Sequence, residues 1–331
     1  MKRWIIGLAL FAFSASSACA QLTEAERKEG FLAIFNGRNF DGLRFSGGKP
    51  AKDGAEPPNW KVADGLVKLS GGGSPHLATH WEYDDFDARF EWKALKKGYN
   101  SGFFIRSGRQ VNAHQINLAQ SACGNLMGGA KGGVAVPELQ KPPGEWNDWR
   151  VLASGDKITF WCNGKQAWEV VGFKAPRGYL GWQAEGAAID FRNFRVKELG
   201  YQPLAFADPK AWDKNDDAYS GDNKAGPLAS ADKLGACTLR CEYKLSEGGK
   251  AFVAARGLKL NLHADDLAKA AHPAKEWNYL EIVVRNSDAQ LWLNGTTFKR
   301  ALNGDADRPV AFTVENGTLQ IRNARVRVAK Q

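Results

Sequence analysis

An internal repeat constrains the fold of this 331-residue chain more than any other feature of its sequence. Four blocks recur in the same order in both halves: residues 90–108 with 241–257, 144–147 with 275–278, 160–164 with 291–295, and 189–196 with 319–326. The step from Trp146 to Asn163 is 17 residues, and the step from Trp277 to Asn294 is also 17 residues. Because chance does not keep four blocks in register, the pattern predicts two copies of one fold.

Each copy is predicted to be an antiparallel β-sandwich. Residues 86–93 alternate apolar with charged side chains, which is typical of a half-buried strand. Residues 157–162 form a second strand that ends at Asn163-Gly164, a strong hairpin signal. Further strands are expected at 180–183 and 188–196, and helix is expected only at 23–29 and 264–271. The prediction is an all-β chain with one sandwich at 31–199 and a second, shorter and degenerate one at 205–331.

The N-terminus has the pattern of a signal peptide over residues 1–20. Lys2 and Arg3 precede an apolar run at 4–13, and Ala18-Cys19-Ala20 forms a small-residue cleavage site. The apolar run is too short to span a bilayer, and no later segment is long and apolar enough to be transmembrane. A lipoprotein acylated at Cys19 is less favoured, because Ser16 stands where a large aliphatic residue is expected. The sequence therefore predicts a periplasmic or secreted protein that begins at about Gln21.

Charge and cysteine usage exclude several classes of protein. The net charge is +9, but Lys and Arg are scattered among Asp and Glu, whereas nucleic-acid binding favours a clustered basic stripe. Cys237 and Cys241 lie four apart in a predicted strand, at about 13 Å, which is beyond disulfide reach. Together with Cys123 and Cys162 they are expected to be buried free thiols. No Cys or His spacing resembles a zinc site.

Ordered motifs in the first half resemble those of a known family. They occur at residues 35–42 (FNGRNFDG), 86–92, 100–102, 104–106, 145–147, 163–164, 181–186 and 191–193. The set is similar to the 3-keto-disaccharide hydrolase domain family, which has a concanavalin-A-like jelly-roll fold. The resemblance covers about residues 31–199 and implies an exported enzyme that cleaves 3-keto-glycosides, the sugars oxidised at C3.

The chain departs from this family at two places. The family usually carries E-x-Q-x-x-D on a central strand, but residues 113–118 read Ala-His-Gln-Ile-Asn-Leu, so Gln115 is kept and both carboxylates are replaced. Leu43 also stands where the family usually has Trp.

The unequal lengths of the two copies point to a functional segment. Arg106 and Trp146 are 40 residues apart, whereas their counterparts Arg256 and Trp277 are 21 apart. The second copy therefore lacks about half of the segment 109–141, and the strand of Gln115 is expected to be lost with it. A segment that the second sandwich does without is expected to serve function rather than folding.

Side-chain alternation groups the candidate site residues on one concave sheet face. The predicted set is Glu91, Arg106, Gln115, Asn117, Gln183 and Glu185. An alternative for two of them is a structural ion pair between Glu91 and Arg106, because the second copy keeps both as Glu242 and Arg256. His114 is predicted to share the opposite face with Ile116 and Leu118, either as an interior residue or as a base. Trp146 is expected in the core, because Trp277 repeats it.

These residue types suit elimination next to a carbonyl. A C3 carbonyl acidifies the C2 proton, so a base can remove it, the C1 substituent can leave, and water can add to the enone. Glu91, His114 or Glu185 would be base and acid, Arg106, Gln115 and Asn117 would stabilise the enolate oxygen, and Gln183 would bind the sugar. No motif indicates a cofactor, although carboxylate and amide oxygens are compatible with a divalent cation.

Three other readings remain open on the sequence. A two-carboxylate glycosidase could use Glu91 and Glu185. A lectin-like module could bind a small carbohydrate without turnover, and a structural protein would use both sandwiches only for packing.

Overall fold

β-Strands connected by loops, with very little helix, make up the computed structural model, which describes residues 22–47, 56–215, 218–304 and 306–329. Among the described residues, helical structure is limited to α1 (Glu24–Glu29), α2 (Asp265–Ala268) and a 3-10 turn at Pro137–Leu139. This confirms the all-β prediction. The predicted signal peptide and Gln21 lie outside the described residues. Within the described ranges, no helix is long and apolar enough to cross a membrane.

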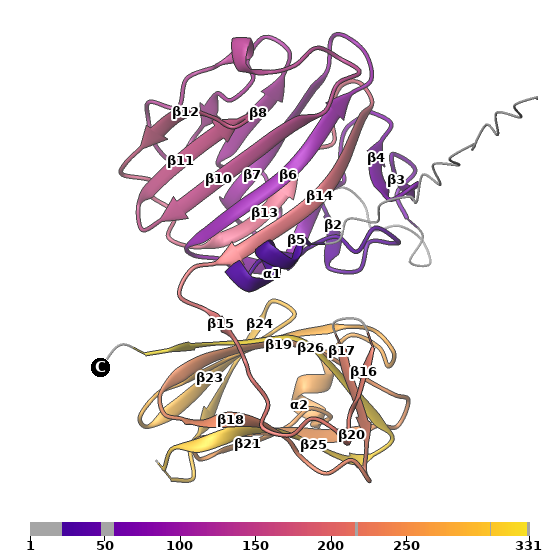
Figure 1. Cartoon of the computed structure of the whole chain (residues 1–331), viewed down its shortest axis with the longest axis vertical. Coiled ribbons are helices and arrows are strands. Elements are labelled where there is room, and N and C mark those ends of the chain that lie inside the picture. The colour runs from indigo at the N-terminus through magenta and orange to yellow at the C-terminus, as the bar shows by residue number, and fades with distance from the viewer. Residues whose placement is uncertain (1–21, 48–55, 216–217, 305, 330–331) are drawn as a thin grey trace, which may run out of the picture.

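Two antiparallel sheets form the first half (Figure 1). The larger sheet has the order β12 (Lys165–Val170), β11 (Lys157–Cys162), β10 (Asn147–Ser154), β6 (Phe86–Ala94), β14 (Ile189–Glu198), β4 (Leu66–Leu69) and β3 (Trp60–Ala63), with β1 (Leu32–Ala33) paired to β14. The six-stranded sheet has the order β2 (Leu43–Ser46), β5 (His76–Tyr83), β13 (Gly178–Trp182), β7 (Asn100–Ser107), β8 (Gln115–Ala119) and β9 (Leu126–Met127). An aromatic-rich core that includes Phe90, Phe103, Trp149 and Trp182 belongs to this sandwich.

Two further sheets form the second half. The larger one has the order β16 (Asp213–Asn215), β17 (Ala218–Asp222), β26 (Thr318–Val328), β19 (Cys237–Leu245), β22 (Asn278–Val284), β23 (Asp288–Leu293) and β24 (Thr296–Ala301), with β15 (Gln202–Pro203) paired to β26. The smaller one has the order β18 (Leu228–Leu234), β25 (Arg308–Asn316), β20 (Lys250–Ala255) and β21 (Leu258–Asn261). This half has its own core, and its side chains are mostly aliphatic.

The strand orders of the halves correspond. When the first larger sheet is followed from β12 and the second from β24, corresponding strands come in the same order across both sheets. In each sheet, one short additional strand pairs with the long strand β14 or β26. The four strands of the smallest sheet match β5, β13, β7 and β8. The prediction that the Gln115 strand is lost is therefore wrong, because β21 pairs with β20 as β8 pairs with β7. In the second half, the counterpart of β2 is reduced to a single bridge between Phe206 and Ser230 of β18, and no counterpart of β9 occurs among the described residues. A common origin of the halves and the domain boundaries stay predictions.

Local signals in the sequence correspond closely to the observed elements. The strand predicted at 157–162 is β11, and Asn163 after it has φ +52°, as a hairpin turn with positive φ requires. Thr23 and Glu26 form a reciprocal capping box that begins α1. Cys237 and Cys241 both lie on β19, and the four described cysteines are buried and free.

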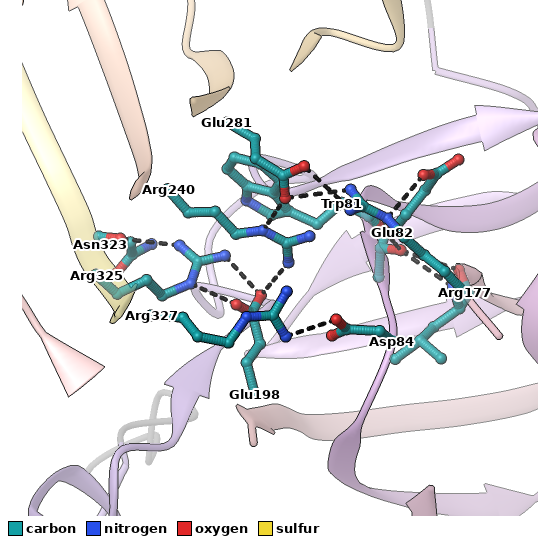
Figure 2. A network of polar contacts seen from close by, with 12 residues as sticks. Trp81, Glu82, Asp84, Arg177, Glu198, Arg240, Glu281, Asn323, Arg325 and Arg327 are labelled. Atoms are coloured by element: carbon teal, nitrogen blue, oxygen red, sulfur yellow. Dashed lines mark hydrogen bonds and ion pairs between the residues drawn. The ribbon is translucent and has the colours of Figure 1, made fainter. Parts of the chain in front are cut away.

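Buried charges join the two halves (Figure 2). Glu198, the last residue of β14, accepts hydrogen bonds from Arg240 at 2.9 Å and from both ends of the Arg325 guanidinium. Arg240 also contacts Glu281 at 2.5 Å, and Glu281 binds Arg177 of the first half at 3.0 Å. Each buried carboxylate in this network contacts two guanidinium groups. Because the opposite charges are paired directly, the network can stay buried between the sandwiches.

Aromatic rings complete this interface. Trp81 of β5 stacks on Trp292 of β23 at 5.5 Å, and its indole N–H donates to Glu242 at 3.3 Å. His80 stacks on Tyr279 at 4.1 Å, and the Tyr279 hydroxyl accepts from the Gly42 amide. The second half therefore packs directly against β5 of the six-stranded sheet.

Candidate functional site

A polar cluster lies on the outer face of the six-stranded sheet, the face that points away from the first core. Gln115 of β8 stands directly opposite Phe104 of β7, and the His76 ring of β5 lies 5.4 Å from the Phe104 ring. The Gln115 amide donates to the side-chain oxygen of Gln183, which follows β13. Side chains from three strands and one loop therefore meet at one place. We call His76, Phe104, Gln115 and Gln183 the amide cluster.

A glycine makes room for this contact. A Cβ on Gly102 would stand 1.6 Å from the amide nitrogen of Gln115, so only glycine lets the Gln115 side chain lie across β7. The backbone of Gln183 is fixed as well, because its N–H donates to Gly102 at 2.8 Å and its carbonyl accepts from the Ser101 hydroxyl at 2.7 Å. The two amides are therefore positioned before any ligand arrives.

Two other side chains border the amide cluster, and Glu185 follows it closely in the sequence. Asn117 is opposite Gly102 on the same side of β8 as Gln115, as predicted from alternation. Glu185 lies two residues beyond Gln183 and is half-buried, and its carboxylate has no hydrogen bond or ion pair among the described residues. Met127 faces Gln115 from β9 and is 49% exposed, so an apolar surface borders the polar groups.

The second half and the segment after β7 cover another part of this face. Trp292 packs against a small apolar cluster of Ala78, Phe104, Val111 and Tyr179. The carbonyl of Arg109 accepts hydrogen bonds from the Arg44 and Ser46 side chains of β2, and its guanidinium donates to the Asn294 carbonyl at 3.3 Å. The amide cluster thus lies beside a surface that both sandwiches build.

Glu91 does not lie on this face. It belongs to β6 in the larger sheet, where its carboxylate accepts from Arg192 at 2.7 Å and from the Asn193 amide. It borders a cavity of about 240 Å³ between the N-terminal segment and β14, also lined by Glu26 and Arg195. The predicted grouping failed because alternation sorts the two faces of one strand but does not tell which of two sheets the strand joins.

Arg106 is also placed elsewhere. Its backbone has φ +42°, and its buried guanidinium donates to the carbonyls of Asp84, Gly155 and Ala175 and to the Asp85 carboxylate. This side chain ties three loops together at one end of the sandwich, which is a structural arrangement. The alternative ion pair between Glu91 and Arg106 is wrong, because each has other partners.

Two aromatic predictions need correction. Trp146 is not in the core: it is half-buried on the outer face of the larger sheet, with Arg192 at 3.9 Å and Lys93 at 4.8 Å from its ring. His114 precedes β8 with φ +59°, so it leaves the alternation of that strand; its ring lies 5.2 Å from Phe173 and its Nδ1 lies 3.2 Å from the Arg106 carbonyl.

His76 and Phe104 are the members of the amide cluster that sequence reasoning left out of its predicted set. His76 begins β5 after a glycine-rich turn, and the alternation of that strand places it on the same side as Ala78. Burial lowers the pKa of His76 below its ordinary value. No three His, Cys, Asp or Glu side chains converge as metal ligands within the ranges that the structure describes.

These features define a jelly-roll type of β-sandwich with a preorganised polar and aromatic surface on one sheet. The family described as the 3-keto-alpha-glucoside-1,2-lyase-like domain matches residues 30–197, about half of the chain. The chain belongs to this family, which gives it a carbohydrate-active, hydrolase-like function.

Individual relatives share only low sequence identity with the chain. The chain is 24% identical over 235 residues to a 3-keto-disaccharide hydrolase of Bacteroides thetaiotaomicron, a match that covers 52% of this chain and 79% of the relative. A putative glycosyl hydrolase of Parabacteroides distasonis is 25% identical, with a TM-score of 0.44, over 54% of this chain and 99% of the other. A carbohydrate-binding module of Bacillus subtilis is 13% identical, with a TM-score of 0.36, over 48% of this chain and 96% of the module.

Proposed function

We propose that this protein cleaves 3-keto-glycosides at the amide cluster, through C2 proton abstraction and elimination followed by hydration. The observation that carries the proposal is the contact between Gln115 and Gln183, with Glu185 two positions later in the sequence and without a hydrogen bond or ion pair to any described residue. Family membership supports the substrate class. The predicted signal peptide supports an exported site of action, which we propose as well.

Glu185 is the proposed base. Its carboxylate takes the C2 proton, the electron pair forms the enolate at the C3 oxygen, and the bond between C1 and the leaving oxygen breaks to give an enone. The carboxylic acid so formed returns a proton to the leaving oxygen. Water then adds at C1 and a solvent proton returns to C2, which gives net hydrolysis. His114 is the rival base, because its Nδ1 faces the Arg106 carbonyl and donates to it, which in the neutral ring leaves the lone pair on Nε2.

The amides supply the polar contacts of the reaction. Gln115 and Gln183 are held by each other and by β7, so they can meet a developing negative charge without rearranging. Glu91 and Arg106 are left out of this mechanism, because each is engaged in its own ion pair away from the amide cluster.

A deuterium label tests the proposal. The purified full-length protein is given a 3-keto-glucoside with deuterium at C2, and the released 3-keto-glucose is analysed for its label. Elimination predicts that the C2 deuterium is lost to solvent. Deuterated 3-keto-glucose incubated with Glu185→Gln protein controls for exchange in the product. Retention of the label during turnover would reject elimination and favour direct displacement at C1.

Variants separate the proposed roles. Gln115→Ala should lower kcat by about 10²-fold, the loss typical of one donor to a developing oxyanion. Glu185→Gln should cost at least as much, whereas His114→Ala should cost less unless His114 is the base. Binding of the sugar with no turnover would contradict the enzyme and favour a lectin-like module.

A further inference from the structure

We propose that His76 is held as a neutral imidazole with its proton on Nε2, and that this N–H donates to the C3 carbonyl oxygen of the bound sugar. The identity of that oxygen rests on the proposed function. The state of the imidazole rests on the contacts and the burial of His76, independently of the substrate.

The position of His76 places it in the amide cluster. It begins β5 opposite Ser46 of β2, and its ring lies against Phe104, which in turn stands opposite Gln115. The loop that carries Gln183 also contacts His76, because the next residue, Ala184, directs its backbone N–H at the ring. His76 therefore faces the same ligand position as the two amides.

The contact with Ala184 fixes the tautomer. The Ala184 amide nitrogen is 3.1 Å from Nδ1, and a peptide N–H can only donate, so Nδ1 must carry its lone pair. A neutral imidazole has one proton, which is then on Nε2. Charging the ring would place a proton between Nδ1 and the Ala184 N–H and break this hydrogen bond.

The other histidines of the chain have the opposite kind of partner. The ring nitrogens of His80, His114, His263 and His272 that contact the backbone all face carbonyl oxygens, so those nitrogens must donate. His76 differs from all four, because its contacting nitrogen accepts. His114 provides the sharpest contrast, since its proton is on Nδ1.

The surroundings of His76 keep it neutral. Burial lowers its pKa, and its Nε2 has no hydrogen-bond partner in the part of the chain that the structure describes. An unpartnered N–H in a half-buried position is a ready donor for a ligand oxygen. With its proton already on Nε2, the ring cannot take the C2 proton, so His76 complements the base instead of replacing it.

Nuclear magnetic resonance tests the tautomer without any substrate. The full-length protein is labelled with 15N-histidine, and two-bond proton–nitrogen correlations at pH 7 are assigned by comparison with His76→Gln. We expect the Nε2–H pattern for His76 and the Nδ1–H pattern for His114 in the same spectrum. An Nδ1–H or doubly protonated pattern for His76 would overturn the proposal.

A binding measurement tests the contact with the sugar. The probe is the 3-keto form of 1,5-anhydroglucitol, which lacks the glycosidic leaving group at C1 and so cannot release an aglycone. His76→Phe should weaken its binding about tenfold, as expected for the loss of one neutral hydrogen bond, and His76→Gln should restore part of the affinity. His263→Gln, in the second half, is the matched control and should bind like the wild type.

Kinetics distinguish a failure of this proposal from a failure of the proposed function. With a 3-keto-glucoside, His76→Phe should lower kcat by about 10²-fold and change KM less, because the contact strengthens as the enolate forms. Turnover by the wild type with full activity in His76→Phe would refute the role of His76 alone. A wild type that neither binds the probe nor cleaves the glucoside would refute the proposed function and the sugar contact together.

Discussion

Glu91 in the first half and Glu242 in the second are held by the same set of side chains. Glu91 binds Arg192 and Asn193, and Glu242 binds Arg322 at 2.6 Å and Asn323 at 3.0 Å. A tryptophan ring lies next to each arginine, Trp146 beside Arg192 and Trp277 beside Arg322. The recurrence of the whole arrangement indicates that it stabilises the long C-terminal strand of each larger sheet.

The surroundings of the two carboxylates differ. The Glu91 side chain is 18% exposed and borders a cavity, whereas the Glu242 side chain is 6% exposed and also accepts from Trp81 of the other half. The residue opposite Glu91 on the neighbouring strand is Asp148, and the residue opposite Glu242 is Tyr279. One local motif thus serves an exposed face in one copy and an interface in the other. A repeated residue therefore reports on folding, and function must be sought among residues that differ between the copies.

The largest difference in stability between matched variants of the two halves is expected for Arg240 of β19 and its counterpart on β6, Arg89. Arg240→Ala leaves Glu198 with Arg325 alone and Glu281 with Arg177 alone, which removes the guanidinium shared by the two buried carboxylates and should lower the free energy of unfolding by about 3–5 kcal/mol. Arg89 makes a partly exposed pair with Asp87, so Arg89→Ala should cost under about 1 kcal/mol. Urea unfolding measures both. If Arg240→Ala does not fold, Arg240→Lys can replace it and should still lose more stability than Arg89→Ala. Equal losses of stability at the two positions would contradict the prediction.

Acid should weaken the contact between the halves. Burial raises the pKa of Glu198, but Arg240 and Arg325 beside it more than reverse this and lower the pKa to about 2. Because the folded pKa lies below the ordinary value of 4.5, Glu198 stabilises the fold above about pH 4.5, and this contribution is lost as the pH falls toward 2. Thermal unfolding from pH 7 to 2 should show a shallower acid decline in Glu198→Gln. An unchanged acid slope would argue against this network.

Glu242 and Glu91 should contribute different amounts to the stability of the fold. Glu242→Gln removes a charge that pairs with Arg322 and accepts from the buried Trp81 indole, and it should cost about 2–3 kcal/mol, whereas Glu91→Gln, next to a cavity, should cost about 1 kcal/mol. Urea unfolding of the two variants provides the comparison. A larger loss for Glu91→Gln would show that exposure does not control the difference.

The smallest expected effect is on turnover. Glu91 lies on the larger sheet, so Glu91→Gln should keep kcat/KM for a 3-keto-glucoside within about threefold of the wild type, roughly 0.65 kcal/mol in activation free energy. Glu185→Gln is the comparison variant in the same assay. A loss at Glu91 as large as at Glu185 would mean that the repeated motif takes part in catalysis.

The sequence by itself determined the local structure and indicated that the two halves correspond. Period-2 alternation predicts strands such as β6 and β11, and Asn163-Gly164 predicts the turn that joins β11 to β12, because these patterns depend on neighbours along the chain. The same alternation correctly placed Gln115 and Asn117 on one side of β8.

Only the tertiary structure decided which strands share a sheet and which side chains meet. Alternation gave Glu91 and Gln115 equivalent outward positions, yet β6 and β8 lie in different sheets. Positive φ at Arg106 and His114 turned both side chains out of the expected pattern, and nothing in their local sequence signals it. The amide cluster depends on Gly102, on a loop after β13 and on the packing of the second half. These are contacts between residues far apart in sequence, so only the folded chain brings them together.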